Sequence, residues 1–188
     1  MAKLPEFTVE GVLPAGDYEL TLEQLRQSVL VAGPGDVAAY PNWDVSWREH
    51  LVDNLAILVD QLWQIGLTEI FVDGSFAEDK EHPNDIDGYF ECELRYLASG
   101  KLEQDLNMLD PHKTWTWDPA GRRPYRGYPK KQLPMWHQYR VELYPHVPGL
   151  PCGIKNNHGN ELEFPAAFRR CRPDGKPRGI VKIVRGAS

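Results

Sequence analysis

Apolar residues recur at helical spacing between residues 47 and 65, and this stripe is the most regular pattern in the chain. Successive positions lie three or four residues apart: Trp47, Leu51, Leu55, Leu58, Leu62 and Ile65. This spacing places the side chains on one face of a helix. Residues 46–49 have the spacing of a capping box, and Gly66 is a typical helix end. We therefore predict one long helix from a cap at Ser46 to Gly66.

Strands are predicted where β-branched and aromatic residues cluster. Three such segments cover residues 68–72, 136–144 and 179–184. Residues 85–90 alternate between polar and apolar, which predicts a further strand. That strand would place Asp85 and Asp87 on one face and Ile86 on the other. Capping signals and leucine spacing predict two more helices, over residues 21–30 and 93–108.

This mixture of strands and helices predicts an α/β (α+β) fold. The chain has 188 residues, a length typical of one domain. We expect a single domain over residues 1–188, in three parts. They are an N-terminal arm and short helix (1–43), a core with the long helix (44–110), and a Pro-rich insert with C-terminal strands (111–188). Eleven of the 16 prolines follow residue 110, which excludes a long helical bundle there.

Charge is distributed unevenly along the chain. The net charge is −6, which argues against a protein that coats nucleic acid. However, residues 73–93 hold eight acids and one lysine, whereas residues 113–140 and 164–188 each hold seven cations and one acid. One acidic segment therefore coexists with two basic ones.

Cysteine spacing and hydropathy exclude several other classes. Cys92, Cys152 and Cys171 form no CxxC pair, so neither a disulfide scaffold nor a structural zinc site is predicted. The N-terminus lacks the pattern of a signal peptide, and no stretch approaches 18 apolar residues. We expect a cytoplasmic protein with no membrane partner, and the oligomeric state stays open.

The acidic segment contains the candidate chemistry. Asp85 and Asp87 lie two residues apart on a predicted strand, so their carboxylates repel one another unless a cation offsets them. Mg²⁺ or Mn²⁺ prefers such oxygen ligands. Gly74 allows close backbone approach, and Ser75 offers an N–H and a hydroxyl to a phosphate. Glu142, an isolated acid in an apolar run, is the candidate third acid, which would allow a second ion.

Three other interpretations of this motif differ in how well the residues fit them. Residues 85–88 also suit a solvated turn. An EF-hand is excluded, since Pro83 and Leu94 occupy positions that need acids. A glycosidase carboxylate pair agrees with the spacing but leaves Gly74 and Ser75 unexplained.

Residues 71–76 (FVDGSF) and 83–87 (PNDID) resemble the signature of the DNA polymerase beta-like nucleotidyltransferase superfamily in its small prokaryotic and phage forms. Residues 13–16 (LPAG) and 175–181 (GKPRGIV) are similar to an uncharacterised group of nucleotidyltransferase-like proteins found near defence and mobile-element genes. Together the resemblance covers nearly the whole chain.

The resemblance implies a nucleotidyltransferase fold with a mixed sheet backed by helices. It implies transfer of a nucleoside monophosphate from an NTP such as ATP to a nucleic-acid or protein hydroxyl, with a toxin–antitoxin or phage-defence context. Gly74 and Ser75 would bind the triphosphate, and Asp85 and Asp87 would ligate both metal ions. Glu142 would be the third acid and help to activate the acceptor hydroxyl, although the superfamily more often has Asp at this position.

Residues 113–140 interleave aromatic and basic side chains, which suits an RNA or protein acceptor. The same pattern suits core rings with a solvated basic face. Arg178 could assist a triphosphate if the last strand lies near the pocket. Two other functions stay open: a non-catalytic nucleotide- or partner-binding module, favoured by the unusual Glu142, and hydrolysis of a phosphoester at the same metal site.

Overall fold

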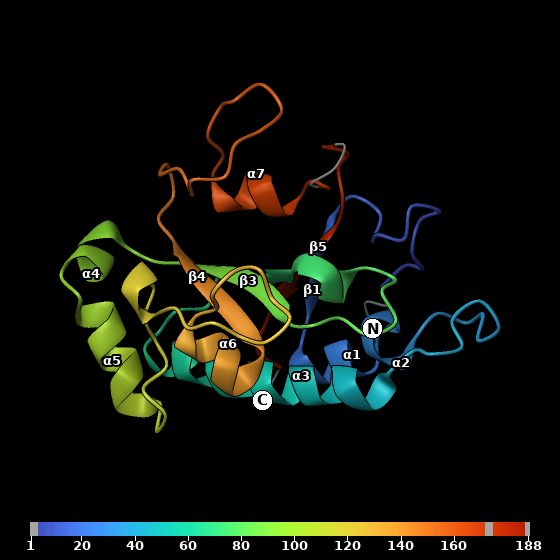
Figure 1. Cartoon of the computed structure of the whole chain (residues 1–188), viewed down its shortest axis with the longest axis horizontal. Coiled ribbons are helices and arrows are strands. Elements are labelled where there is room, and N and C mark those ends of the chain that lie inside the picture. Colours follow the sequence, from blue (N-terminus) through green and yellow to red (C-terminus); the bar gives the residue numbers. More distant parts are fainter. Residues whose placement is uncertain (1–3, 172–174, 187–188) are drawn as a thin grey trace.

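A five-stranded mixed sheet forms the centre of the computed structural model (Figure 1). The structure describes residues 4–171 and 175–186, so the ends of the predicted domain and part of the basic stretch 164–188 lie outside the described residues. The strands are β1 (Asp17–Leu20), β2 (Ile70–Asp73), β3 (Ile86–Glu91), β4 (Val141–His146) and β5 (Ile180–Ile183). Their spatial order is β1-β5-β2-β3-β4. β2 is antiparallel to its neighbours β3 and β5, while β1 pairs with β5 and β3 with β4 in parallel.

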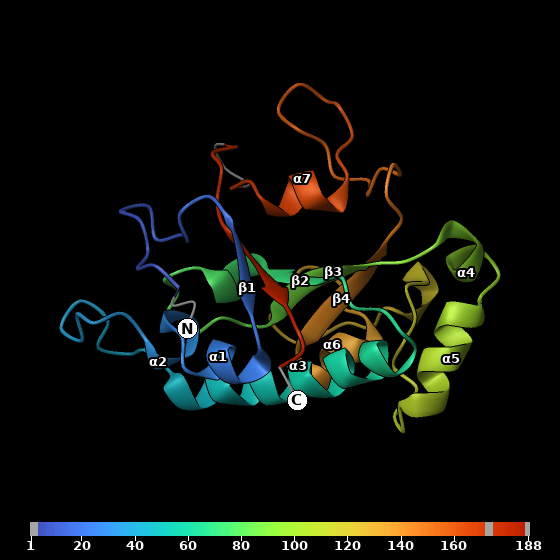
Figure 2. The same ribbon diagram turned by 180° about the vertical axis from the view of Figure 1, so that it is seen from behind.

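Helices cover the two faces of this sheet unequally. They are α1 (Leu22–Arg26), α2 (Val29–Ala32), α3 (Val45–Gln64), α4 (Leu94–Ala98), α5 (Lys101–Leu109), α6 (Pro134–Tyr139) and α7 (Phe164–Phe168), with the short 3-10 helices η1 (Gly74–Ala77) and η2 (Pro119–Gly121). α1, α2, α3 and α6 lie against one face, and α7 lies over the other (Figures 1 and 2). The predicted α+β class with a mixed sheet backed by helices is confirmed.

The long predicted helix is present as α3, and its leucine stripe is buried. Leu51, Leu55, Leu58 and Leu62 are fully buried in the main core, where they pack with the strand residues that face the same way. Burying each such side chain stabilises the fold by about 2 kcal/mol. The predicted cap was wrong: Asp44, not Ser46, accepts a hydrogen bond from the Trp47 N–H at 2.9 Å. A charged carboxylate acceptor two residues earlier therefore starts the helix.

Two predicted helices are each divided in the structure. Residues 21–30 form α1 and α2, because the Ser28 side chain caps a new helix. Residues 93–108 form α4 and α5, because Gly100 adopts a left-handed conformation with φ of 72° between them.

The predicted strand at residues 136–144 was wrong in its first half. Pro134 occupies the first turn of α6, where proline is favoured, and the helix ends at Arg140, whose φ is 56°. Strand β4 begins only at Val141. Met135 and Trp136 are buried, so tertiary packing rather than strand alternation accounts for these aromatic and apolar residues.

β1 and α7 lie where no strand or helix was predicted. β1 follows the turn-rich residues 13–17, and α7 lies in the Pro-rich C-terminal part. α7 packs Phe168 against Phe71, Tyr89 and Ile180 on the second face of the sheet. Among the residues described, no helix has the length and apolar character needed to cross a membrane.

Candidate functional site

The Gly74–Ser75 turn begins where β2 ends. Gly74 has φ of 76°, a conformation that L side chains rarely adopt. A Cβ at this position would lie only 2.8 Å from Asp87 Oδ2. Both backbone conformation and close approach therefore require glycine, and they bring the turn directly against the Asp87 carboxylate.

A buried arginine organises the loop that follows this turn. The Arg48 guanidinium, on α3, donates hydrogen bonds to the carbonyl oxygens of Leu30, Phe76, Glu78 and Lys80. Burial lowers the Arg48 pKa to about 9. The sequence analysis missed this residue. Helical spacing could have identified Arg48 as a buried residue, because it lies on the same face of α3 as the buried Val52.

Strand register places three acids side by side. In β3, Asp87 pairs with Asp73 of β2 on one side and with Glu142 of β4 on the other. Residues paired across neighbouring strands point to the same face. This is the face that carries Tyr89 and α7, opposite α3. The strand of Glu142 thus lies beside the strand of Asp87.

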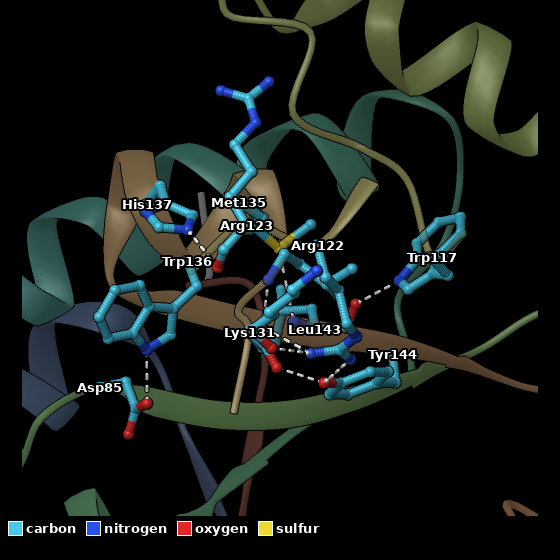
Figure 3. Close-up of polar contacts among 12 residues, drawn as sticks. Asp85, Trp117, Arg122, Arg123, Lys131, Met135, Trp136, His137, Leu143 and Tyr144 are labelled. Atoms are coloured by element: carbon cyan, nitrogen blue, oxygen red, sulfur yellow. Dashed lines mark hydrogen bonds and ion pairs between the residues drawn. The ribbon is translucent and has the colours of Figure 1, made fainter. Parts of the chain in front are cut away.

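The Glu142 carboxylate is already engaged. It is 5% exposed, and its Oε1 accepts a hydrogen bond from the Leu133 N–H at 3.0 Å. Its Oε2 accepts a hydrogen bond from the Tyr144 hydroxyl, and Arg122 lies 3.7 Å from Oε1 (Figure 3). Burial and the neighbouring carboxylate raise the pKa of Tyr144. Both oxygens of the predicted third acid therefore have protein partners.

Asp85 precedes β3 and has a different environment. Its Oδ2 accepts a hydrogen bond of 2.6 Å from the Trp136 indole N–H (Figure 3). The indole also packs under the Arg140 guanidinium, 3.8 Å from the ring centre. Asp85 therefore contacts the aromatic region between residues 113 and 140.

A pocket of about 440 Å³ opens beside Asp87. Its walls include Asp73, Gly74, Ser75, Glu78, Asp87 and Arg178. Asp85 and Glu142 do not line it. Of the five predicted site residues, the structure thus gathers Gly74, Ser75 and Asp87 at one cavity and leaves Asp85 and Glu142 in neighbouring environments.

Asp73 and Arg178 form a buried ion pair in the wall of this pocket. Arg178 forms an ion pair with Asp73 through one guanidinium nitrogen and with Glu78 through another. Burial raises the pKa of Asp73 to about 7, although Arg178 opposes the shift. The sequence analysis placed Arg178 near the pocket conditionally, and it lies there. It missed Asp73, although this acid directly precedes Gly74.

Within residues 4–171 and 175–186, no three His, Cys, Asp or Glu side chains are arranged to hold a metal ion. Carboxylates are nevertheless the oxygen donors that Mg²⁺ and Mn²⁺ prefer. Asp87 beside Gly74 and Ser75 fits a metal–phosphate site. Asp85 fits in part, since a hydrogen bond engages its Oδ2, whereas Glu142 in its present contacts does not fit as a ligand.

The aromatic and basic region divides into core and surface. Trp115 is fully buried and donates a hydrogen bond to Gln61 at 2.6 Å, so it belongs to the core. Tyr125 is 39% exposed and contacts both Tyr128 and Trp136. Exposed aromatic and basic side chains therefore concentrate in the loop before α6, on the Asp85 side of the site.

The chain matches the model of one protein family over residues 5–184. It therefore belongs to that family, which is described as a family of unknown function (DUF6932). No curated protein and no solved structure matches the chain. The activity has to be argued from the site itself.

Proposed function

We propose that this protein is a metal-dependent nucleotidyltransferase with a nucleotidyltransferase fold, which moves a nucleoside monophosphate from an NTP to a nucleic-acid or protein hydroxyl. One observation carries the proposal: Gly74, Ser75 and Asp87 line the same pocket, with Gly74 too close to Asp87 for any side chain. A glycine-serine turn against a carboxylate suits a triphosphate bound with a divalent cation.

In this reaction the acceptor oxygen forms a bond to the α-phosphorus, and the bond to the leaving pyrophosphate breaks. Ser75 would bind the triphosphate through its N–H and hydroxyl, and Gly74 would let it approach the backbone. Asp85 and Asp87 would hold Mg²⁺ or Mn²⁺. The bound cation would offset the negative charge of the triphosphate and of the leaving pyrophosphate.

Glu142 would accept the proton of the acceptor hydroxyl. Its Oε2 now accepts a hydrogen bond from the Tyr144 hydroxyl, so the hydroxyl of the acceptor substrate would take the place of the tyrosine hydroxyl. The exposed aromatic and basic loop before α6 would then contact an RNA or protein acceptor, because it lies on the side of Asp85 and Glu142.

The transfer is tested by incubating the protein with Mg²⁺ or Mn²⁺, each α-labelled NTP, and total RNA or cell lysate. We expect label on an acceptor with wild type and with Asp60→Asn, a control at an exposed position on α3. The double variant Asp85→Asn/Asp87→Asn should reduce labelling by about 100-fold or more. Equal labelling by this variant would refute the proposal.

The satisfied hydrogen bonds of Glu142 favour one alternative, a non-catalytic module that binds nucleotide. The same experiment separates the two functions when NTP binding is measured in parallel. Tight NTP binding by wild type with no labelled acceptor under any condition would support the module.

A further inference from the structure

Asp73 differs from Glu142 in how its carboxylate oxygens are satisfied. The residue is 1% exposed, and its Oδ1 has no hydrogen-bond partner. Its Oδ2 pairs with Arg178. A buried carboxylate oxygen without a partner costs roughly 1–3 kcal/mol or more, so such atoms are uncommon unless something else binds them.

The position of this oxygen indicates what could bind it. Asp73 pairs in register with Asp87, and both residues line the 440 Å³ pocket. Two acids on neighbouring strands of one face repel each other unless a cation lies between them. Mg²⁺ binds through one or two carboxylates and keeps water or phosphate oxygens as its other ligands, so two acids are sufficient.

The charges around the pocket also favour a cation. Four acids line it, Glu10, Asp73, Glu78 and Asp87, against the two arginines Arg170 and Arg178. Arg178 already forms ion pairs with two of these acids. It therefore holds Asp73 in place without satisfying Oδ1.

On the other side of Asp87, Glu142 has hydrogen-bond partners at both of its carboxylate oxygens. It accepts hydrogen bonds from the Leu133 N–H and the Tyr144 hydroxyl, and the Arg122 guanidinium lies nearby. A metal ion at Glu142 would have to displace these hydrogen-bond partners. At Asp73 Oδ1 it would displace no hydrogen bond.

We propose that the pocket binds a hard divalent cation, Mg²⁺ or Mn²⁺, between Asp73 and Asp87, and that Glu142 is not one of its ligands. This deepens the proposed nucleotidyl transfer by placing Asp73, which lines the pocket, in the ligand position that the resemblance gives to Asp85, which does not line it. Metal binding itself can be measured without any nucleotide. Arg178 is then a positioning residue, which orients Asp73 through Oδ2.

The test measures Mn²⁺ binding to the full chain by electron paramagnetic resonance of the free ion. The variants are Asp73→Asn, Asp87→Asn and Glu142→Gln, with Asp60→Asn as a matched surface control. We expect Asp73→Asn and Asp87→Asn each to weaken Mn²⁺ affinity about tenfold or more. Glu142→Gln and Asp60→Asn should change it less than about twofold.

Asp73→Asn leaves Arg178 with one fewer buried counter-ion, which can impair folding. Circular dichroism therefore accompanies each titration, and Asp73→Asn/Arg178→Gln replaces the single variant if that one does not fold. The double variant should also lose affinity about tenfold. Arg178→Gln alone, which keeps both carboxylates, should retain more of the affinity than the double variant does.

Two results would overturn the inference. One is loss of Mn²⁺ affinity in Glu142→Gln with wild-type affinity in the folded Asp73 variant, and the other is no Mn²⁺ binding by wild type. The first leaves nucleotidyl transfer intact with another ligand set. Conversely, the expected binding pattern without any transferred label would refute the enzyme but keep the metal site.

Discussion

At the scale of single residues, buried polar groups divide into those with a complete set of partners and those without. Glu142 accepts hydrogen bonds from a backbone N–H and a hydroxyl, one at each oxygen. Arg48 donates to four carbonyl groups, but its buried Nε has no partner. Asp73 Oδ1 has no such partner. Such an unmet group is costly, and of the described residues that carry one Asp73 is the one that lines the pocket beside Asp87, which makes it the candidate ligand.

Asp110 is the clearest structural example among the acids. It is fully buried after α5 and accepts hydrogen bonds from the Thr114 N–H at 2.7 Å and hydroxyl at 2.6 Å. The Tyr139 hydroxyl donates to it at 2.8 Å, and the His112 N–H at 3.1 Å. Burial alone would raise the Asp110 pKa, but these hydrogen bonds outweigh it and lower the pKa.

We predict that Asp110 makes stability depend on pH in the acid range. A lowered folded-state pKa stabilises the fold above the unfolded value of about 3.9, and this contribution disappears as pH falls through the folded value. Asp110→Asn should therefore lower the free energy of unfolding by about 2 kcal/mol at pH 7, and the difference from wild type should shrink below about pH 4.

Urea unfolding at several pH values measures this difference. The control is Asp53→Asn, an exposed acid paired with Arg26, for which the change should stay below about 1 kcal/mol at every pH. A difference between Asp110→Asn and wild type that stays constant down to pH 2.5 would contradict the assignment.

At the scale of elements, junctions matter more than the helices and strands themselves. The turn from β2 into η1 places Ser75 beside Asp87, and α6 with its left-handed Arg140 sets where β4 begins. The register of β4 then determines that Glu142, rather than a neighbour, lies opposite Asp87. Short connections thus select which side chains meet.

We predict that Gly74→Ala affects ligand binding beyond its effect on stability. Gly66, with φ of 85° and nothing within 4 Å of an added Cβ, is the matched control, because it tests backbone strain alone. Both alanine variants should lose about 1 kcal/mol of stability. Only Gly74→Ala moves Asp87, so it alone should weaken binding of Mg²⁺-NTP, by about tenfold or more.

Thermal unfolding and NTP titration measure the two effects separately. The same NTP affinity in Gly74→Ala as in Gly66→Ala, with both variants folded, would show that the turn does not contact the nucleotide.

At the scale of the whole molecule, the two faces of the sheet differ in how much apolar surface they bury. The α3 face contacts the main core, whereas the α7 face holds a small cluster of Phe71, Tyr89, Phe168 and Ile180. Arg169, directly after α7, donates hydrogen bonds to the Asp17 carboxylate and the Tyr89 hydroxyl, and these bonds connect α7 to the sheet. The proposed metal pocket lies on this thinner side, next to Phe168.

We predict that α7 opens locally before the main core unfolds, because little buried apolar surface opposes its release. Phe168→Ala should accelerate amide hydrogen exchange in residues 164–168 while exchange in α3 changes little. Leu55→Ala, in the main core, should instead cost about 2–5 kcal/mol and accelerate exchange throughout. Equal protection of α7 and α3 amides in wild type would contradict this view.

Much of the local structure was predictable from the sequence. The apolar stripe of α3 and the presence of a strand at β3 were confirmed, because each depends on residues close together in the chain. The polar–apolar alternation was not, since Gly88, Tyr89 and Phe90 are all buried. The second half of the chain was harder. Its many prolines argue against helices, so a short helix such as α6 is difficult to predict. The apolar residues of α6 are buried by contacts with distant segments.

The sequence by itself determined the acids at Asp85, Asp87 and Glu142 and the glycine-serine turn that make a phosphate and metal site chemically reasonable. Only the tertiary structure decided which acids share a pocket. Pairing of β2 with β3 sets Asp73 beside Asp87. Packing of distant segments brings Arg178 to Asp73 and Arg122 to Glu142. These contacts join residues 14 to 105 positions apart, and no local pattern encodes them because they depend on how the whole core packs.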